Sequence, residues 1–464
     1  MERYNPTSLE GLHGAALELK ERVERKEAVI AVVGLGYVGM PIALEFAKKG
    51  FKSIGIDVVA RKVDMINQGE NFIEDLNDED VKAMVSAGRL SASTSFEQVA
   101  KADVIFIAVP TPFSSQKDPD LSFIVSAGAA ISEYLQPGAL VILKSTTFPG
   151  TTEDYLKPQL EKGGLKAGKD FFLAFSPERV DPGNKVFTTA NTPIVTGGID
   201  PVSTIIASMV NNQIIEDIYM VSDPKVAEME KLLENIFRSV NIALVNELAL
   251  LCERMGGINV WEVVDAAGTK PFGYLKFTPG PGVGGHCIPI DPYYLSWLAR
   301  EYDFETRFIT LAANVNEGMP YHVVHLVLRE LARQPIALAD AKVLILGASF
   351  KKNVKDLRHS PTEGIIHRLI EEGITDIDIS DPWAPMYETA GRTFYHVDLT
   401  EETLSSYNIV ILVTDHDAFE MDFVVKHAKH IIDTRNMAKD VKEGREKITL
   451  LGASNPRKKL VFEH

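Results

Sequence analysis

The sequence predicts an α/β protein in which two regions of alternating strands and helices are separated by a long helical stretch. The chain has 464 residues, about three times the ~150 residues of a typical domain, so two or three domains are expected. Two regions carry short apolar runs of strand length, commonly with Gly or Pro at their ends, as in parallel α/β sheets. Between them, residues 225–255 have apolar positions at spacings of three and four and contain neither Gly nor Pro, which indicates a helix.

The first α/β region covers residues 28–220 and follows a short extension. Residues 1–26 alternate charged and apolar side chains and lack the pattern of a signal peptide, so the extension, residues 1–27, is expected to be a short amphipathic helix. In the region itself, strands are expected at residues 29–33, 52–56, 104–109, 140–143 and 171–175.

The middle of the chain is expected to be helical, with a second α/β region after it. Residues 225–255 should form one long helix, and residues 302–330 also have a helical pattern. We therefore assign residues 221–330 to a central helical domain. The second α/β region, residues 331–464, has expected strands at residues 342–347, 376–379 and 409–413.

The composition excludes several classes of protein. Lys plus Arg number 48 and Asp plus Glu number 64, giving a formal charge of -16, the opposite of the broad basic field of nucleic-acid-binding proteins. The longest uncharged candidate for a membrane span, residues 28–44, is broken by three glycines and Pro41. Cys252 and Cys287 are too few for a disulfide framework, which favours a reducing cytoplasm. Neither nucleic acid nor membrane is expected as a partner.

A dinucleotide-binding pattern opens the first α/β region. An apolar strand runs into Gly34-Leu-Gly36-Tyr-Val-Gly39, a helical pattern follows, and the next strand ends at Asp57, 23 residues after Gly34. In such a unit the first glycine permits the tight turn, the second lets a pyrophosphate approach the backbone, and the third lets helix and strand pack. An acid at Asp57 would accept hydrogen bonds from ribose hydroxyls and favours NAD, although the nearby Arg61 and Lys62 leave NADP open.

Two further motifs follow later strands of this region. Val109-Pro-Thr-Pro112 and Lys144-Ser-Thr-Thr147 stand at strand ends, where open α/β sheets bind their ligands. By themselves both motifs are ordinary turns.

A glycine- and proline-rich loop surrounds one of the two thiols. Residues 279–291 read PGPGVGGHCIPID, a composition that disfavours helix and strand and predicts a shaped loop. Such a loop allows Cys287 and backbone N–H groups to approach a ligand, as a covalent nucleophile requires, but a structural cysteine fits the spacing equally well. Cys252, beside two leucines, fits a structural thiol. His286 receives no role, because no second ligand stands at metal spacing.

Lys231 and Asn235 share one face of the long helix, where they could hold an oxygen that gains negative charge. The alternative is a solvated ion-pair face made by Glu230, Lys231 and Glu234. Glu178 follows a strand in Phe175-Ser-Pro-Glu-Arg and fits either an acid–base group or a surface carboxylate.

Taken together, the motifs resemble the nucleotide-sugar 6-dehydrogenase family, which includes the UDP-glucose and UDP-N-acetylhexosamine dehydrogenases. The resemblance covers about residues 28–437 and rests on the ordered series GLGYVG, VPTP, KST, SPER, EKLLEN, GGHCIPID, SFKK with DLR, and DTRN. It implies two Rossmann-like, doubly wound parallel-sheet domains joined by a long central helix and a helical middle domain. It also implies a homodimer, or a larger homo-oligomer, with the long helix in the interface.

The resemblance assigns roles to individual residues and implies NAD as cofactor and a UDP-sugar as substrate. Catalytic roles would belong to Cys287, Lys231, Asn235, Thr146, Glu178 and Asp291. The cofactor would be held by Gly34, Gly36, Tyr37, Val38, Gly39, Asp57, Lys62, Val109, Pro110, Thr111, Ser145, Thr146 and Arg358. The UDP-sugar would be held by Glu178, Arg179, Lys231, Asn235, Tyr274, Gly284, Lys351 and Arg435. No metal is implied.

The implied reaction is a four-electron oxidation of a C6 alcohol to a carboxylate. The first oxidation yields an aldehyde, the Cys287 thiolate adds to it, and the thiohemiacetal is oxidised to a thioester that water hydrolyses. Two rival functions are a two-electron β-hydroxyacid dehydrogenase and a non-catalytic NAD-binding sensor. Two, one or no NADH per substrate molecule would distinguish the three functions.

The motifs are most similar to the N-acetylhexosamine branch of the family. Arg179 stands where UDP-glucose enzymes usually carry Phe, and Ile290 where they carry Lys, which argues against UDP-glucose. The expected substrate is UDP-N-acetylglucosamine, with UDP-N-acetylmannosamine, a galacto epimer and UDP-glucose as alternatives. The product would be a nucleotide-linked uronic acid for a bacterial surface polysaccharide, such as a lipopolysaccharide O-antigen.

Overall fold

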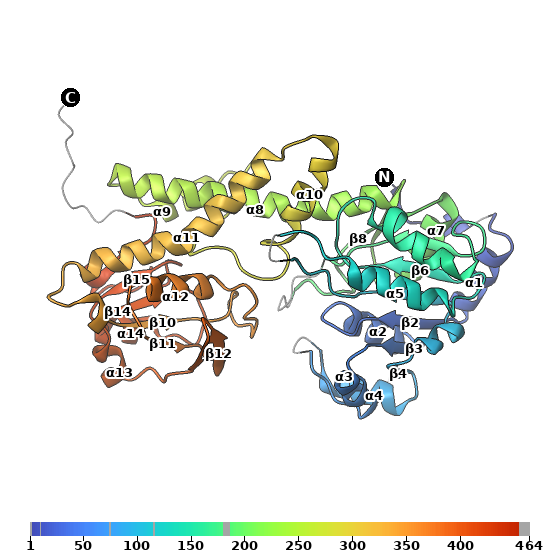
Figure 1. Cartoon of the computed structure of the whole chain (residues 1–464), viewed down its shortest axis with the longest axis horizontal. Helices are drawn as coiled ribbons and strands as arrows, with labels where there is room; N and C mark the ends of the chain where they lie inside the picture. The colour runs from blue at the N-terminus through green and yellow to red at the C-terminus, as the bar shows by residue number, and fades with distance from the viewer. Residues whose placement is uncertain (1, 10, 74–75, 115–116, 180–185, 454–464) are drawn as a thin grey trace. The chain divides into compact units, whose positions relative to one another are not determined.

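The computed structural model describes residues 2–9, 11–73, 76–114, 117–179 and 186–453. The contacts divide the chain into two compact units (Figure 1). The first unit is Met1–Glu234 with Arg300–Tyr302, and the second is Asn235–Ala299 with Asp303–His464. Each unit is built around its own largely parallel sheet.

The first unit contains a doubly wound sheet. Among the described residues it has nine strands in the order β1-β9-β8-β7-β6-β5-β2-β3-β4. Its parallel part contains β2 to β7 and has the strand order 3-2-1-4-5-6 of a Rossmann fold. The order of the strands reverses between β2 and β5, which are parallel to each other. These strands are β2 (Val29–Val33), β3 (Lys52–Ile56), β4 (Leu90–Ser93), β5 (Val104–Ile107), β6 (Leu140–Leu143) and β7 (Phe172–Phe175).

Three further strands extend the sheet beyond β7. The strand β8 (Ile194–Gly198) is antiparallel to β7, and β9 (Ile218–Val221) is parallel to β8. The strand β1 (Glu2–Arg3) pairs antiparallel with β9, so part of the extension completes the sheet instead of being helical. The amphipathic helix expected there is α1 (Ala15–Glu24), which buries Ala16, Leu19 and Val23.

Helices pack on this sheet because its strands are apolar on both faces. Residues of β2, β5 and β6 are almost completely buried, as expected for parallel strands covered on both sides. The helices are α2 (Gly39–Lys48), α3 (Ala60–Asn67), α4 (Asp78–Ser86), α5 (Ser122–Ser132), α6 (Lys157–Leu160) and α7 (Pro201–Asn211). Short 3₁₀ and π segments lie at Pro6–Leu9, Phe96–Lys101, Thr151–Leu156 and Glu161–Gly163.

The long helix expected from the sequence is α8 (Pro224–Met255). The boundary between the two units falls within it, after Glu234. Among the described residues it is the one helix whose length and composition would suit a membrane span, yet 39% of its most apolar window is buried within the protein. Such a helix also occurs in the core of soluble proteins, so it is weak evidence for a membrane.

Further helices follow in the second unit. They are α9 (Val260–Gly268), α10 (Asp291–Ala299) and α11 (Arg307–Leu331), with a 3₁₀ segment at Arg300–Tyr302 that belongs to the first unit. The helical pattern expected at residues 302–330 is therefore confirmed mainly as α11, which begins five residues later and contains Pro320.

The second unit has a five-stranded parallel sheet in the order β11-β10-β14-β15-β16. This order, 2-1-3-4-5, is the other common doubly wound arrangement, and it reverses between β10 and β14. The strands are β10 (Lys342–Leu346), β11 (Asp376–Ser380), β14 (Ile409–Leu412), β15 (Ile431–Asp433) and β16 (Ile448–Leu450). The fold class of two Rossmann-like domains is thus confirmed.

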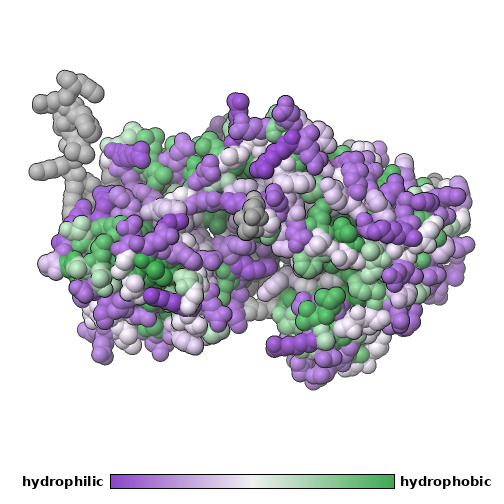
Figure 2. Space-filling model, in the orientation of Figure 1, coloured by the Kyte–Doolittle hydropathy of each residue, from purple (hydrophilic) through white to green (hydrophobic). Residues whose placement is uncertain are grey.

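The remaining elements of the second unit cover its sheet or extend its loops. They are α12 (Pro361–Glu371), α13 (Glu401–Ser406), α14 (Met421–His427), the antiparallel hairpin of β12 (Met386–Thr389) and β13 (Arg392–Tyr395), and 3₁₀ segments at Leu338–Asp340 and Arg445–Lys447. Hydrophilic residues occupy most of the face seen in Figure 2, and hydrophobic residues form scattered patches on it.

Candidate active site

The three glycines after β2 have three different surroundings. Gly34 has φ +94°, a left-handed conformation, and an added Cβ would lie 2.4 Å from the Ala108 carbonyl oxygen. A Cβ at Gly39 would lie 1.8 Å from the Gly34 oxygen. A Cβ at Gly36 would meet nothing within 4 Å. The turn therefore leaves open space at Gly36, just before the N-terminus of α2, as a bound pyrophosphate requires.

Asp57 lies directly after β3 with its carboxylate at this turn. Its Oδ2 accepts a hydrogen bond from Leu35 N at 2.9 Å and lies 3.1 Å from Lys62 Nζ, and Oδ1 accepts from Val59 N at 2.9 Å. The carboxylate thus links the glycine turn to the end of β3. The residues present fit an NAD site, with Gly36 for the pyrophosphate and Asp57 for a ribose.

The other cofactor residues expected in this unit lie on the same turn and at two further strand ends. Tyr37 is exposed and Val38 half-buried at the turn itself. Ser145, after β6, donates a hydrogen bond to the Val109 carbonyl oxygen at 2.7 Å and so joins the KST motif to the VPTP motif. Pro110 is exposed, and Thr111 and Thr146 are half-buried.

A buried carboxylate that the sequence did not indicate ties the KST segment to α8. Glu228 is completely buried, and it accepts hydrogen bonds from Gly150 N, Thr152 N and Thr152 Oγ1 at 2.6 to 2.9 Å. Burial raises the pKa of Glu228 to about 7, although these hydrogen bonds oppose the shift. Glu228 lies one turn before Lys231, so it connects the two segments that carry Thr146 and Lys231.

Lys144 is the first residue of the KST motif, and no role of its own was predicted for it. It follows the apolar strand β6, is 2% exposed, and its Nζ has no hydrogen-bond partner among the residues that the structure describes. Burial lowers the pKa of Lys144, and the charge of Glu178 opposes this shift. A lysine that continues a buried apolar strand is the signal that could have identified it.

Arg179 changes the interpretation of the acidic residues on α8. Its guanidinium forms ion pairs with Glu230 and Glu234 and donates a hydrogen bond to the Pro193 oxygen at 2.8 Å. Lys231 is only 8% exposed. The interpretation as a solvated ion-pair face is therefore wrong for Lys231, whereas Glu230 and Glu234 do form ion pairs and are partly exposed. Glu178 is half-buried, and its Oε1 accepts a hydrogen bond from Arg179 N at 2.9 Å.

In the second unit, three of the expected catalytic residues come together. Asn235 on α8 is 5% exposed and donates from Nδ2 to Asp291 Oδ2 at 2.6 Å. Asp291, the first residue of α10, donates from its backbone N to the Cys287 carbonyl oxygen at 2.8 Å. Cys287 is half-buried and is not part of a disulfide. Lys231 lies one turn before Asn235 on the same helix.

Several glycines of the loop at residues 279–291 lie so close to neighbouring residues that a side chain would not fit, which the sequence did not reveal. A Cβ at Gly280 would lie 2.7 Å from Arg435 Nη1, and a Cβ at Gly284 would lie 2.5 Å from Phe350 Cβ. Gly285 has φ +88° and donates to the Arg358 carbonyl oxygen at 2.9 Å. These glycines allow close packing against the second α/β region.

The residues expected to contact ligands from the second α/β region follow β10 and β15. Lys351 is half-buried in the segment after β10. The Arg358 guanidinium donates to both carboxylate oxygens of Asp356, at 2.9 and 2.5 Å. Arg435 donates from Nε to the Val413 oxygen at 3.0 Å, and Tyr274 is half-buried after α9.

The cysteine that was expected to be structural, Cys252, is buried within α8, and burial raises its pKa. Among the described residues, no group of three or more His, Cys, Asp or Glu side chains could hold a metal ion.

Comparison with known proteins identifies the family over most of the chain. Three models of the UDP-glucose/GDP-mannose dehydrogenase family match: its NAD binding domain at residues 28–221, its central domain at 225–318 and its UDP binding domain at 344–440. The chain is 36% identical over 397 residues to UDP-N-acetyl-D-glucosamine 6-dehydrogenase of Pseudomonas aeruginosa, covering 85% of this chain and 92% of that protein.

Two further relatives carry different sugar names. The chain is 37% identical to the NDP-N-acetyl-D-galactosaminuronic acid dehydrogenase of Ralstonia nicotianae over 88% of this chain and 96% of that protein. The solved structure of UDP-D-ManNAc dehydrogenase from Pyrococcus horikoshii superposes with a TM-score of 0.83 at 33% identity, covering 91% of this chain and 99% of that one.

Proposed function

This chain belongs to the UDP-glucose/GDP-mannose dehydrogenase family and is an NAD-dependent UDP-sugar dehydrogenase, and we propose that it oxidises C6 of UDP-N-acetylglucosamine to the uronic acid. The relatives described above are named for N-acetyl sugars, which supports a UDP-N-acetylhexosamine. The product would serve the synthesis of a surface polysaccharide.

The choice among the N-acetylhexosamines depends on small differences between the relatives. The SPER and GGHCIPID motifs are most similar to those of the UDP-N-acetylglucosamine enzymes. The Pseudomonas relative named for that sugar is 36% identical, and the Ralstonia relative named for a galacto sugar, which stays an alternative, is 37% identical. UDP-N-acetylmannosamine is the second candidate, because relatives named for that sugar are 34 to 35% identical and the Pyrococcus structure has the same fold. UDP-glucose is a weaker candidate, since Arg179 is engaged with Glu230 and Glu234 where a Phe is usual.

The observation that carries the proposal is the group of Asn235, Asp291 and Cys287 around the start of α10. The Asp291 carboxylate orients the Asn235 amide, and the turn that ends at Asp291 holds the backbone of Cys287. A Cys287 thiolate can add to a C6 aldehyde and retain it for the second oxidation. Lys231 and Asn235, one turn apart, would stabilise the anionic oxygen of the tetrahedral species.

The remaining residues would prepare the reaction and complete it. When bound, NAD would supply the hydride acceptor, with a separate NAD molecule for each of the two oxidations. Gly34 to Gly39 and Asp57 would hold that cofactor, with Lys62, the residues at 109–111, Ser145 and Arg358. Glu178, Thr146 and Asp291 would position the water that hydrolyses the thioester and take up its proton. Arg179, Tyr274, Gly284, Lys351 and Arg435 would hold the UDP-sugar.

We also propose that the chain forms a homodimer through α8, in the cytoplasm, where Cys287 would stay reduced. An exposed apolar stripe supports this assembly, with Leu244, Leu248, Leu251 and Met255 at spacings of three and four and each at least 38% exposed. Light scattering should give the mass of two chains, and Leu248→Glu should shift the mass toward one chain. An unchanged mass in the Glu variant would remove this stripe from the interface.

The proposal is tested by product stoichiometry with UDP-sugars that differ only at C2 and C4. UDP-N-acetylglucosamine should give the highest kcat/KM, two NADH per sugar and the uronic acid. Cys287→Ala should give at most one NADH per sugar and leave the aldehyde or its hydrate, while both ligands still bind. A folded Ala variant that makes uronic acid at the rate of the unmodified enzyme would show that Cys287 is structural.

A further inference from the structure

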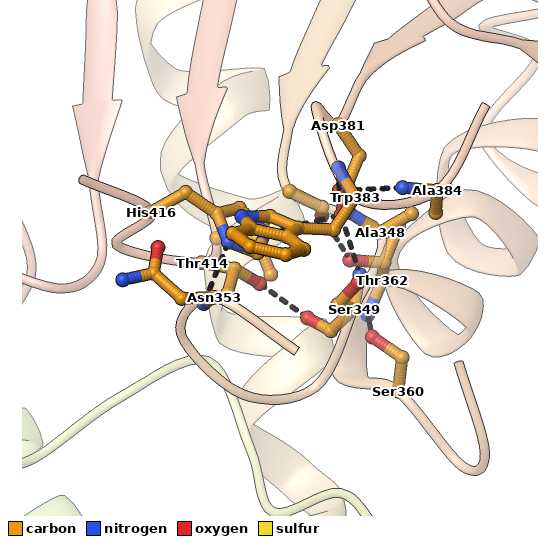
Figure 3. A network of polar contacts seen from close by, with 12 residues as sticks. Ala348, Ser349, Asn353, Ser360, Thr362, Asp381, Trp383, Ala384, Thr414 and His416 are labelled. Carbon is orange, nitrogen blue, oxygen red and sulfur yellow. Dashed lines mark hydrogen bonds and ion pairs between the residues drawn. The ribbon is translucent and has the colours of Figure 1, made fainter. Parts of the chain in front are cut away.

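The segment between β10 and α12 is held by hydrogen bonds both before and after Lys351. Before Lys351, Ala348 N and Ser349 N both donate to Asp381 Oδ2, at 2.7 and 2.8 Å. After Lys351, Asn353 N donates to His416 Nδ1 at 2.9 Å. Lys351 therefore lies in a short span whose two ends are held by residues after β11 and after β14 (Figure 3).

His416 takes part in the hydrogen bonds on both sides of Lys351. It is 2% exposed, and its Nε2 lies 3.1 Å from Asp381 Oδ2, the oxygen that accepts from Ala348 and Ser349. Because a backbone N–H can only donate, Nδ1 must be the acceptor, so the neutral ring carries its proton on Nε2 and donates it to Asp381. The ring thus bonds directly to Asn353, after Lys351, and is linked through Asp381 to Ser349, before Lys351 (Figure 3).

The Asp381 carboxylate is held in place by several hydrogen bonds. Burial raises the pKa of Asp381, but the hydrogen bonds from His416 and from the Ser349 and Trp383 amides outweigh it and hold the pKa at about 2. A second oxygen, Oδ1, accepts from Trp383 N and Ala384 N at 2.8 and 3.0 Å. The carboxylate is therefore engaged within the protein and stays ionised at neutral pH.

Asn353 has a left-handed backbone conformation and is held by hydrogen bonds on its backbone and its side chain. Its φ is 56°, in the left-handed region that a non-glycine residue adopts at some cost. Its side chain exchanges two hydrogen bonds with Asp417, and Lys352 pairs with the same carboxylate at 2.5 Å, but these groups are more exposed. Among the described residues, the part-buried bond to His416 is the one hydrogen bond of the Asn353 backbone N–H.

We propose that His416 is a positioning residue that sets the place of Lys351 for the UDP-sugar. This inference rests on the proposed function, which assigns Lys351 to that ligand. His416 touches no ligand in the proposal; its acceptor nitrogen holds the backbone two residues after Lys351, and its donor nitrogen holds the Asp381 carboxylate that anchors Ser349.

Two substitutions separate the two bonds of the ring. Asn places its amide oxygen near the position of Nδ1, so His416→Asn keeps an acceptor for Asn353 N and loses the donor to Asp381. Gln reaches the position of Nε2, so His416→Gln keeps the donor and loses the acceptor. The proposal expects His416→Gln to raise KM for the UDP-sugar about three- to tenfold, as the loss of one hydrogen bond implies, while kcat and KM for NAD change less than about twofold. His416→Asn should change KM for the UDP-sugar much less, because the Asp381 carboxylate keeps its four hydrogen bonds from backbone N–H groups.

A second histidine on the other side of Asp381 supplies a matched control. Asp381 N donates to His396 Nδ1 at 3.0 Å, and no hydrogen bond between His396 and residues 349–358 occurs in the described part of the chain. His396→Gln should lower the melting temperature about as much as His416→Gln but leave KM for the UDP-sugar unchanged. If His396→Gln raises that KM equally, the effect of His416 is general destabilisation and the proposal is wrong.

A double-mutant cycle with Lys351→Ala tests whether His416 acts through Lys351, with isothermal titration of UDP as a second measurement. In the Lys351→Ala background, His416→Gln should raise KM for the UDP-sugar less than about 1.5-fold, because the group it positions is gone. Full additivity would overturn the inference. If Lys351→Ala alone leaves KM and UDP affinity unchanged, the proposed role of Lys351 fails. If Lys351→Ala raises KM and His416→Gln does not, only the positioning role fails.

Discussion

Adding one methyl group at Gly36 or at Gly39 should separate cofactor binding from stability. At Gly39 the new Cβ would lie 1.8 Å from a backbone oxygen, whereas ordinary contacts begin at 3.4 Å, so α2 and the turn would have to separate by roughly 1.6 Å. Because the obstacle is backbone, Gly39→Ala should destabilise the protein by about 3 kcal/mol or more. At Gly36 the Cβ meets nothing, so Gly36→Ala should change stability by less than about 1 kcal/mol.

Affinity for NAD should instead be sensitive to the substitution at Gly36, which hardly changes stability. The methyl of Gly36→Ala would occupy the open space that we assign to the pyrophosphate, so Kd for NAD should rise at least about tenfold in a protein with a nearly unchanged melting temperature. Isothermal titration with NAD and thermal unfolding without ligand measure the two quantities separately. A stable Gly36→Ala protein that binds NAD normally would show that the pyrophosphate does not pass this turn. A Gly39→Ala protein as stable as the unmodified one would contradict the packing argument.

Three further substitutions test the other parts of the site. Lys231→Met should lower kcat about 100-fold or more and change KM for the UDP-sugar little, because its charge acts on an oxygen that becomes anionic during the reaction; a change in KM alone would make it a binding contact. Arg435→Ala should raise KM for the UDP-sugar about tenfold and leave KM for NAD unchanged, and a loss confined to NAD would place it at the other ligand. The pKa of Glu228 is raised from 4.5 to about 7 in the folded state, so its protonated form stabilises the protein fully at pH values below 4.5. This contribution is lost as the pH rises through about 7. The free energy of unfolding should therefore fall by about 3 kcal/mol between these pH values because of Glu228. Glu228→Gln should flatten this part of the curve in urea unfolding followed by circular dichroism, and equal slopes would mean that Glu228 is ionised throughout.

The elements that were predicted from the sequence are those whose local pattern is strong. The strands β2, β3 and β6 begin and end at the expected residues, and α8 begins one residue earlier than expected. The strand β8 was not predicted, because two of its five residues are glycines, and no local signal marks the two-residue strand β1. Such strands form because an existing sheet edge provides partners, which is information that a local window does not contain.

The same limit applies to the site. The glycine turn and Asp57 were found because their spacing is short and regular. Glu228, by contrast, meets Gly150 and Thr152 from more than 70 residues away, and His416 lies 35 residues from Asp381. From the sequence alone, Glu228 and His416 are an acid in a helix and a histidine in a loop, and their partners become visible only once strands distant in sequence lie side by side.

The pairing of β1 with β9 has a consequence for synthesis on the ribosome. Arg3 pairs with Tyr219, so more than 200 residues must be added after β1 before its partner exists. At ~5–20 residues per second, β1 waits for roughly 10 to 40 seconds. The free edge of β9, which could otherwise pair with another nascent chain, is then covered by a strand that is already present. A sequence fused directly before Glu2 would therefore interfere with the last closing step of this sheet more than with its earlier folding.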